Sequence, residues 1–423
     1  MKITRYLYYL LTLPLVLSAC TSQDEEMPVQ GDAEQRIVLQ VAESNSLTSR
    51  AGRPLYSNEP KQEVDIVQLF ICTKNDNGNY TIVSKKEIGN WMDTSKEYNK
   101  GRKHEILLTG ADHLPEGEAD YMIFAVGYTY REGNNTEYTV GTESTNLHTY
   151  LEGLKTDGSN TFPEYLTLSL NNAPGEEIFA GSEPIGTNVA GGFSATVELR
   201  RQVAGVYMYV KDIPSIEKTT KLSLTASADN NGLVLGQFDE ENVMNGTAPE
   251  SGEGRFELCS INLNEWKDTD GNWKNPYAGE ADFQEGAYYA GCFVIPFSAT
   301  GEQSLQIERY EGNTKAQTWD VNLPDAPKSI WAWNATNNNF GNAAQEVTES
   351  ETSYSLLRNH LYCIGTRGQD EFEDSSEPGG EEPTPPSDDN PESLKREGSP
   401  IILKVLDNWD RLYDMELEPT PED

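Results

Sequence analysis

Residues Thr196–Asp212 read TVELRRQVAGVYMYVKD, and the prediction of the fold starts from this stretch. It contains two apolar-rich pieces, one on each side of Gln202–Gly205. Apolar pieces this short, separated by a break, indicate β-strands rather than a helix. Arg200 and Arg201 are expected to mark the edge of a strand.

The same kind of pattern recurs along the whole chain. Tyr165–Leu170 (YLTLSL) alternates strictly, with three leucines on one face, as expected for a half-buried antiparallel strand. Turn signals such as Asn77-Gly78 and Asp270-Gly271 separate the runs. Further strands are predicted at Ile37–Val41, Val64–Cys72, Ile106–Leu108, Tyr121–Tyr130, Leu222–Ala226, Phe256–Leu263, Ala287–Phe297, Leu305–Tyr310, Trp319–Leu323, Tyr362–Gly365 and Ile401–Leu406. Because no long helical periodicity appears, the sequence predicts an all-β protein built from two β-sandwich domains.

The first twenty residues indicate export. Lys2 and Arg5 precede an apolar run, Tyr6–Leu17, which is too short for a comfortable membrane span. Small residues follow and lead to Ala19 and Cys20, as in a bacterial lipobox. We expect residues 1–19 to be a lipoprotein signal peptide, with cleavage between Ala19 and Cys20 and lipid on the Cys20 sulfur. The alternative is an ordinary signal peptide that ends near a cysteine.

The remainder of the chain is expected to consist of a tether, two domains and one acidic loop. Residues 20–35 are predicted to be an acidic tether, and the acidic patch Ser22–Glu26 resembles the signal for surface export of Bacteroidota lipoproteins; the alternative is a solvated linker. We expect an N-terminal β-sandwich domain at 36–193 and a C-terminal one at 194–423. Residues 370–399 are predicted to form an acidic disordered loop, because residues 370–392 lack Lys and Arg and are rich in Pro, Gly and Ser.

Charge and motifs exclude several classes of function. The 423 residues contain 69 Asp and Glu against 32 Lys and Arg, a net charge of −37, which argues against nucleic-acid binding. The four histidines are scattered, so no metal site is predicted. No motif of a hydrolase, nucleotide-binding or metalloprotease site appears, so we expect neither enzymatic activity nor a cofactor. Asn75–Gly78 and Asp268–Gly271 faintly resemble calcium loops but fit hairpin turns better.

Four cysteines remain after Cys20. Cys72, Cys259, Cys292 and Cys363 are widely spaced and form no CxxC pair, so a zinc or redox motif is not supported. An exported chain is allowed disulfides, and Cys259 could pair with Cys292. The sequence favours buried, unpaired thiols on strands.

Several segments together resemble the Bacteroidales fimbrillin superfamily, nearest to its anchor and accessory subunits of the FimB type. The resemblance spans most of the mature chain and rests on the order of motifs that are individually weak. They are the lipobox at Cys20, Ser49–Arg53 (SRAGR), Glu177–Gly181 (EIFAG), Leu199–Val206 (LRRQVAGV), Arg358–Gly365 (RNHLYCIG) and the final strand with Trp409.

The resemblance implies two transthyretin-like β-sandwich domains and a role in building or anchoring surface fimbriae. In polymerising members a trypsin-like protease cuts after an arginine, which removes the first strand, and a strand from a neighbouring subunit fills the groove. Arg50, Arg53 and Arg36 are therefore candidate processing sites, with ordinary surface arginines as the alternative. Period-two side chains of the last strand are candidate donor residues, with a strand of the protein's own sheet as the alternative: Ile401, Leu403 and Val405.

The expected function is that of a lipid-anchored subunit on the outer-membrane surface, an anchor or accessory component or a tip. Its expected partners are other fimbrial subunits, the outer membrane through the N-terminal lipid, and a ligand on host or bacterial surfaces. One alternative is a surface glycan-binding lipoprotein of a nutrient-uptake system, for which Trp266, Trp273, Trp331 and Trp333 are candidate platform residues. Another is a secreted hydrolase with a deep cleft.

Overall fold

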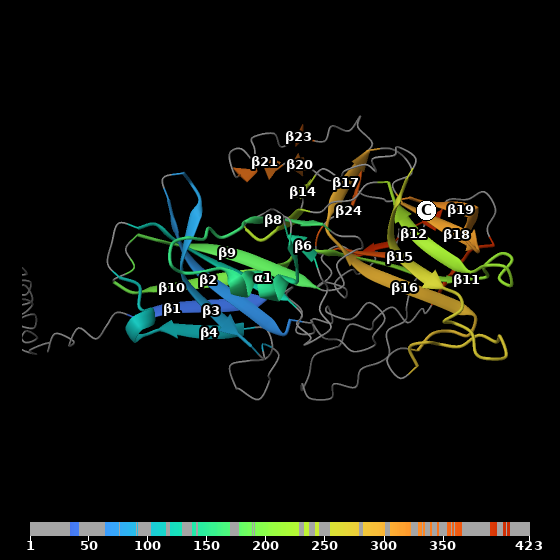
Figure 1. The fold of residues 1–423 in the computed structure, drawn as a ribbon, viewed down its shortest axis with the longest axis horizontal. Helices are drawn as coiled ribbons and strands as arrows, with labels where there is room; N and C mark the ends of the chain where they lie inside the picture. The colour runs from blue at the N-terminus through green and yellow to red at the C-terminus, as the bar shows by residue number, and fades with distance from the viewer. Residues whose placement is uncertain are drawn as a thin grey trace, which may run out of the picture.

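The protein is almost entirely β-structure, as its sequence predicts (Figure 1). The computed structural model describes residues 34–41, 64–75, 77–89, 91, 103–115, 119–128, 138–140, 143–169, 177–187, 189, 191–227, 232–236, 242–244, 254–278, 282–300, 305–322, 329–331, 333–334, 339–340, 345–346, 353–356, 358, 360–365, 390–395, 401–402 and 404–406. Helical structure in these residues is confined to α1 (Leu147–Gly153) and a 3-10 turn, η1 (Gly110–Asp112). Neither is a helix that could cross a bilayer, and the described chain contains no other candidate.

The strands fall into two groups along the chain. The first ten are β1 Gln35–Val41, β2 Ile66–Lys74, β3 Tyr80–Ile88, β4 Lys103–Leu108, β5 Tyr121–Tyr128, β6 Tyr138–Val140, β7 Glu143–Thr145, β8 Tyr165–Ser169, β9 Ile178–Gly186 and β10 Phe193–Arg201. The longer strands that follow are β11 Ala204–Lys211, β12 Lys221–Ala226, β15 Phe256–Asn262, β16 Ala287–Val294, β18 Leu305–Glu311 and β19 Thr314–Asn322. The shorter ones are β25 Leu361–Ile364, β13 Gly232–Val234, β14 Asn242–Met244, β17 Phe297–Thr300, β20 Ser329–Trp331, β21 Trp333–Asn334, β22 Asn339–Phe340, β23 Gln345–Glu346, β24 Ser353–Leu356, β26 Glu392–Ser393, β27 Ile401–Ile402 and β28 Lys404–Leu406.

The first half is built on one seven-stranded sheet with the order β3-β2-β5-β9-β10-β1-β4. Its apolar side chains on one face form a compact group, here called the N-terminal core, to which β1, β2, β4, β5 and β10 all contribute. Trp91, just beyond one edge strand, lies against His104 of the other edge strand, with ring centroids 6.0 Å apart. The sheet therefore curls around its core until its two edges meet, which gives a sandwich-like unit.

The central strands of this sheet are buried on both faces. In β2, Val67, Leu69 and Ile71 enter the N-terminal core, while Phe70 and Cys72 point to the opposite face. That opposite face is covered by α1, whose N-cap Asn146 accepts a hydrogen bond from the Thr149 N–H at 2.8 Å. Burial on both faces explains why β2 reads as a continuous apolar run instead of an alternating one.

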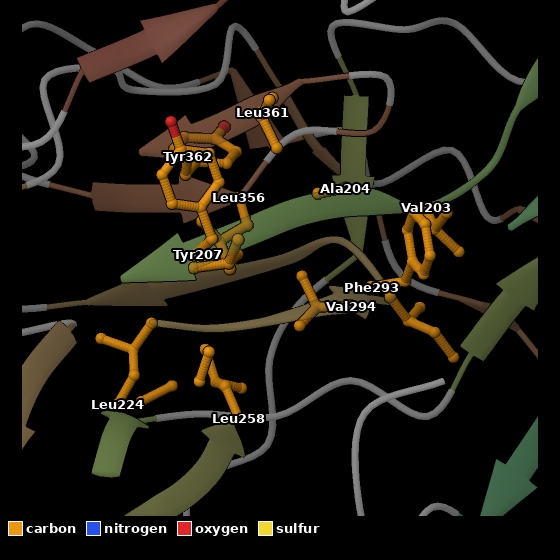
Figure 2. Packing of buried hydrophobic residues seen from close by; sticks show 14 of the residues in the cluster. Val203, Ala204, Tyr207, Leu224, Leu258, Phe293, Val294, Leu356, Leu361 and Tyr362 are labelled. Atoms are coloured by element: carbon orange, nitrogen blue, oxygen red, sulfur yellow. The ribbon is translucent and has the colours of Figure 1, made fainter. Parts of the chain in front are cut away.

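The second half contains two facing sheets. Their orders are β16-β11-β25-β28, with β26 also paired to β11, and β15-β12-β18-β19-β27. Leu224 and Leu258 from the second of these sheets point toward the strands that carry Tyr207 and Val294 (Figure 2). These side chains belong to a second apolar group, here called the shared core, because it continues without a break onto the outer face of the seven-stranded sheet.

The expected boundary between residues 193 and 194 does not separate the sheets, because two later strands pair with strands of the first half. β10 begins there, but it pairs with β1 and β9 of the first sheet. The change of sheet occurs between Arg201 and Ala204, where β11 begins. In addition β13, from the second half, pairs with β8 in the four-stranded sheet β13-β8-β6-β7. Both halves are thus joined by hydrogen-bonded strands as well as by the shared core.

Part of the segment expected to be a disordered acidic loop is ordered. Residues 370–389 and 396–399 lie outside the described residues, but β26 pairs in parallel with β11. Leu394 is 1% exposed in the shared core, and Ser393 and Lys395 bind the carboxylate of Asp212 at 2.9 and 3.3 Å. One buried leucine and two polar contacts hold this short piece in place. The overall acidic composition of the segment does not reveal that it contains such a piece.

Close approach of β9 and β10 gives a test of this packing. A Cβ at Gly181 would lie 2.0 Å from the backbone oxygen of Glu198, so Gly181→Ala must push two paired strands apart. We expect the free energy of unfolding to fall by about 3 kcal/mol, measured by urea denaturation. Gly191→Ala is the matched control, because nothing lies within 4 Å of its Cβ position. Equal stability of the two variants would contradict the close approach.

Candidate functional site

The first strand is an internal strand of the seven-stranded sheet. β1 runs parallel to β10 and antiparallel to β4, so its backbone is hydrogen bonded along both sides. The side chains of Ile37 and Leu39 are 0% exposed and lie in the N-terminal core. The edge strand β4 is held in the sheet only through β1 among the described strands. Removal of β1 would therefore uncover the core and detach β4 as well.

A buried amide fixes the start of this strand. The side chain of Gln35 is fully buried, and its Nε2 donates to the backbone oxygens of Leu114 and Val189, both at 3.0 Å. Its Oε1 accepts from the Leu114 N–H at 2.8 Å. Three hydrogen bonds compensate the cost of burying this amide and set the register of β1 against the loops around it.

The candidate processing residues separate into two sets. Arg36 lies within β1, where its guanidinium forms ion pairs with Glu34 and, at 2.7 Å, with Glu105 on β4. The hydrogen bond to Glu34 raises the pKa of Arg36, so its charge is secure at any physiological pH. Cleavage there would have to break an internal strand, which makes Arg36 a poor protease site. Arg50 and Arg53, like the lipobox residues Ala19 and Cys20, lie outside the described residues.

The candidate donor strand pairs within its own chain. Ile401 is 5% exposed and belongs to β27, which runs parallel to the end of β19. Val405 belongs to β28, which pairs with β25 in the facing sheet, and Leu403 between them lies outside the described residues. The C-terminal segment therefore crosses from one sheet of the second half to the other. It pairs with one sheet through the two residues of β27 and with the other through the three residues of β28.

Three of the quoted motifs converge at the junction between the halves. Glu177 precedes β9, Arg201 ends β10, and Arg358 precedes β25. The Arg201 Nε lies 2.8 Å from Glu177 Oε1, and both side chains are completely buried. The guanidinium also stacks over the ring of Phe179, 4.9 Å from its centroid. Arg201 therefore marks the end of β10 as a buried junction residue, whereas Arg200 is half-exposed and pairs with Glu198.

A glutamine connects this ion pair to the third motif. The Gln202 backbone N–H donates to the Ile178 oxygen at 2.7 Å, and its side-chain Oε1 accepts from Arg358 Nη1 at 2.8 Å. Next to it, the Gly205 N–H donates to the His360 oxygen at 2.9 Å. We call Glu177, Arg201, Gln202 and Arg358 the junction network. Its role is structural, because it holds buried charged and polar side chains in fixed positions.

Two of the four tryptophans considered for a glycan-binding platform have described side chains. Trp266 is 1% exposed, and Trp273 is half-buried with its Nε1 donating to the Ala287 oxygen at 2.8 Å, so neither forms an exposed glycan platform. Trp331 and Trp333 lie in β20 and β21, and their side chains are not described.

Asn75 and Asp268 each accept two backbone N–H bonds within their own turns, as expected for hairpin turns. The described residues contain no cluster of His, Cys, Asp and Glu suited to a metal ion.

Sequence reasoning missed the two buried polar clusters. The sequence places Gln35 in the expected tether and Glu177 in the EIFAG motif. A single polar residue beside an apolar run gives no local sign that it is buried. Such a residue becomes informative only when its partner, here Leu114 or Arg201, is known to lie across the sheet.

The junction network gives a double-mutant test. Glu177→Leu should remove the carboxylate that lies 2.8 Å from the buried guanidinium of Arg201 and lower the free energy of unfolding by about 3–5 kcal/mol. Combining it with Arg201→Met should recover much of that loss, because no unpaired charge remains. The exposed pair Glu198 and Arg200 is the matched control, and Glu198→Leu should cost less than about 1 kcal/mol. Additive losses in the double variant would show that the pair is not coupled.

The chain is distantly similar to solved structures of fimbrial proteins. A search of curated proteins finds no match. Among solved structures, the chain is similar to the tip fimbrial protein Mfa3 from Porphyromonas gingivalis, at 11% identity over 78% of this chain and 93% of that one, with a TM-score of 0.38. It is also similar to the fimbrial anchor protein Mfa2 from the same organism, at 12% identity over 77% and 100%, with a TM-score of 0.34. These likenesses are distant, and the family is shown by a sequence model instead.

That family model describes fimbrillin-A associated anchor proteins Mfa1 and Mfa2, and it matches residues 42–357. The match covers most of the chain and includes the EIFAG and LRRQVAGV segments of the junction. It assigns the chain to fimbrial proteins and not to enzymes, in agreement with the absence of catalytic motifs in the sequence. The chain therefore belongs to the family of fimbrillin-A associated anchor proteins.

Proposed function

We propose that this chain is a lipid-anchored surface subunit that holds a fimbria at the outer membrane, in an anchor or accessory role. The observation that carries this proposal is the position of β1. It begins fifteen residues after Cys20 and is hydrogen bonded on both sides inside the seven-stranded sheet. A lipid on Cys20 would therefore be joined to the folded body through an element that cannot leave without opening the N-terminal core.

Anchoring also needs a membrane attachment strong enough to hold a fibre. Cys20 in a lipobox would carry a thioether-linked diacylglycerol, with acyl chains such as palmitate. Each buried CH₂ contributes about 0.8 kcal/mol, and two or more chains give stable attachment where a single chain does not. The acidic tether between Cys20 and β1 gives the folded body distance from the membrane.

The N-terminus of the chain in purified fimbriae tests this role. We expect mass spectrometry to find a lipid-modified Cys20 as the first residue, and Cys20→Ala to abolish co-sedimentation of the chain with outer membranes. The variant protein should still show the wild-type unfolding temperature, since Cys20 lies before β1. A mature N-terminus at Ala51 would instead mean that β1 is removed, and would overturn the anchor role.

Contact with neighbouring subunits is proposed to occur by strand complementation. Added strands bind through main-chain hydrogen bonds, and pockets for alternate side chains provide specificity. The C-terminal segment supports a donor role better than β1 does, because β27 and β28 pair over only two and three residues whereas β1 pairs over seven. Its release would also leave the junction network in place.

A covalent lock tests whether the C-terminal strand must leave. Lys404 of β28 is the direct partner of Cys363 in β25, so Lys404→Cys places two thiols opposite each other. In cells lacking the native chain, we expect the oxidised variant to be absent from purified fimbriae and a reducing agent to restore its incorporation. Lys404→Ser is the control and should be incorporated under both conditions. Normal incorporation of the locked variant would exclude release of β28.

The glycan-binding alternative gains no support from the described residues. Of its candidate platform residues, Trp266 is buried and Trp273 is half-buried against the shared core. Membership of a fimbrial family implies contact with other fimbrial subunits, and a surface ligand on host or bacterial cells stays a prediction.

A further inference from the structure

Two cysteines lie on the neighbouring outer strands of the two facing sheets. Cys259 belongs to β15, the outer strand of one sheet, and Cys292 belongs to β16, the outer strand of the other. These strands contact each other at the side of the sandwich. Both side chains are half-buried against the shared core, and the two thiols lie close enough to interact. The pair therefore spans the seam between two sheets, since β15 and β16 are not paired with each other among the described strands.

The chain between the two strands returns to its starting point. The described residues of this stretch, 263–278 and 282–286, include an aromatic cluster around Trp266, whose ring lies 6.2 Å from Trp273, 5.9 Å from Tyr277 and 5.4 Å from Phe283, measured between centroids. Trp273 then hydrogen bonds to Ala287 at the start of β16. This excursion is a compact aromatic loop, and its closure is what brings Cys292 back beside Cys259.

We propose that Cys259 and Cys292 form a disulfide in the mature protein, which fastens the two sheets of the second half to each other. The inference rests on the proposed export of the chain, because disulfides form and persist outside the cytoplasm. Cys72 and Cys363 stay as thiols, since each is fully buried within its own sheet.

The chemistry is thiol–disulfide exchange with a disulfide oxidant, a protein dithiol oxidase in the cell or oxidised glutathione in solution. The Cys259 sulfur attacks one sulfur of the oxidant, and the other leaves as a thiolate. The Cys292 sulfur then attacks Cys259, forms the intramolecular bond and releases the second thiol. Two protons and two electrons pass to the oxidant, which is reduced to two thiols.

The environment of the pair fits this order of events. The interaction with the Cys259 thiol, together with burial, raises the pKa of Cys292, so Cys292 remains a protonated thiol in the reduced protein. Cys259 and Cys292 are less completely buried than Cys72, so an oxidant reaches them more readily, and burial also raises the pKa of the Cys72 thiol. Reactivity of a thiol depends on its ionisation and access, so oxidation should be selective for the seam.

The expected effect is stabilisation by loop closure. The bond would join residues 33 positions apart and enclose the aromatic loop. Closing a loop of this length restricts the unfolded chain, and we expect the unfolding temperature of the oxidised protein to exceed that of the reduced protein by about 5–10 °C.

The test uses the full chain purified under reducing conditions and then exposed to oxidised glutathione. Free thiols are alkylated, and the protein is digested without reduction. We expect one cross-linked peptide pair containing Cys259 and Cys292, with Cys72 and Cys363 alkylated after denaturation. A parallel sample, alkylated in intact producing cells before lysis, should show the same pair.

Matched variants separate the bond from general oxidation effects. Cys292→Ser removes one sulfur and should abolish both the cross-link and the oxidant-dependent rise in unfolding temperature. The double variant Cys259→Ser with Cys292→Ser should behave in the same way, and comparison of oxidised and reduced samples of each variant cancels any loss of packing.

The outcomes distinguish the two proposals. Four alkylated thiols after oxidation of the pure protein, or a cross-link that involves Cys72 or Cys363, would overturn the disulfide. A bond that forms in solution but is absent from intact cells would overturn its presence in the mature protein and count against the proposed export. Lipid on Cys20 with no bond in either sample would leave the anchor role intact and refute the disulfide alone.

Discussion

A buried ion pair sits where the chain passes from one sheet to another, and the arrangement of the two halves depends on it. Arg201 ends β10 and β11 begins three residues later, so the charged side chain of Arg201 is buried at the point where the chain changes sheets. An isolated guanidinium there would be prohibitively costly, and Glu177 at 2.8 Å makes its burial tolerable. Because Gln202 joins the ion pair to Arg358, three distant segments are fixed relative to one another.

The sequence predicts the fold class well and the sheet assignments less well. Strands with clear apolar runs, such as β2, β5 and β12, were expected close to where they lie, because burial shapes their composition directly. β10 was expected to open the second half, yet it pairs with β1 and β9. Strand pairing is a long-range property, and nothing within Phe193–Arg201 indicates which strand lies beside it. The same holds for β13, three residues that join the sheet of β8.

The candidate site, like the fold, could be predicted from the sequence only in part. The motif segments around Glu177, Arg201 and Arg358 were recognised as a set, but their convergence depends on tertiary contacts that no spacing rule reveals. Arg36 was a reasonable processing candidate until its place in an internal strand was known. Ile401 was expected either to serve a partner or to complete the chain's own sheet, and in the described residues it does the latter. Polar residues with a buried partner were the hardest to interpret, because their energetic role depends on the partner.

The direction of β1 has a mechanical consequence. Its hydrogen bonds to β10 and β4 run across the strand, and its N-terminal end leads straight into the tether. Under the proposed anchoring, a force between membrane and fibre would act along the axis of β1. All of its cross-strand bonds would then bear the load together in shear, whereas a force across the strand would peel them apart one at a time. If the chain is anchored in this way, an internal strand next to the tether would be well suited to bear tension.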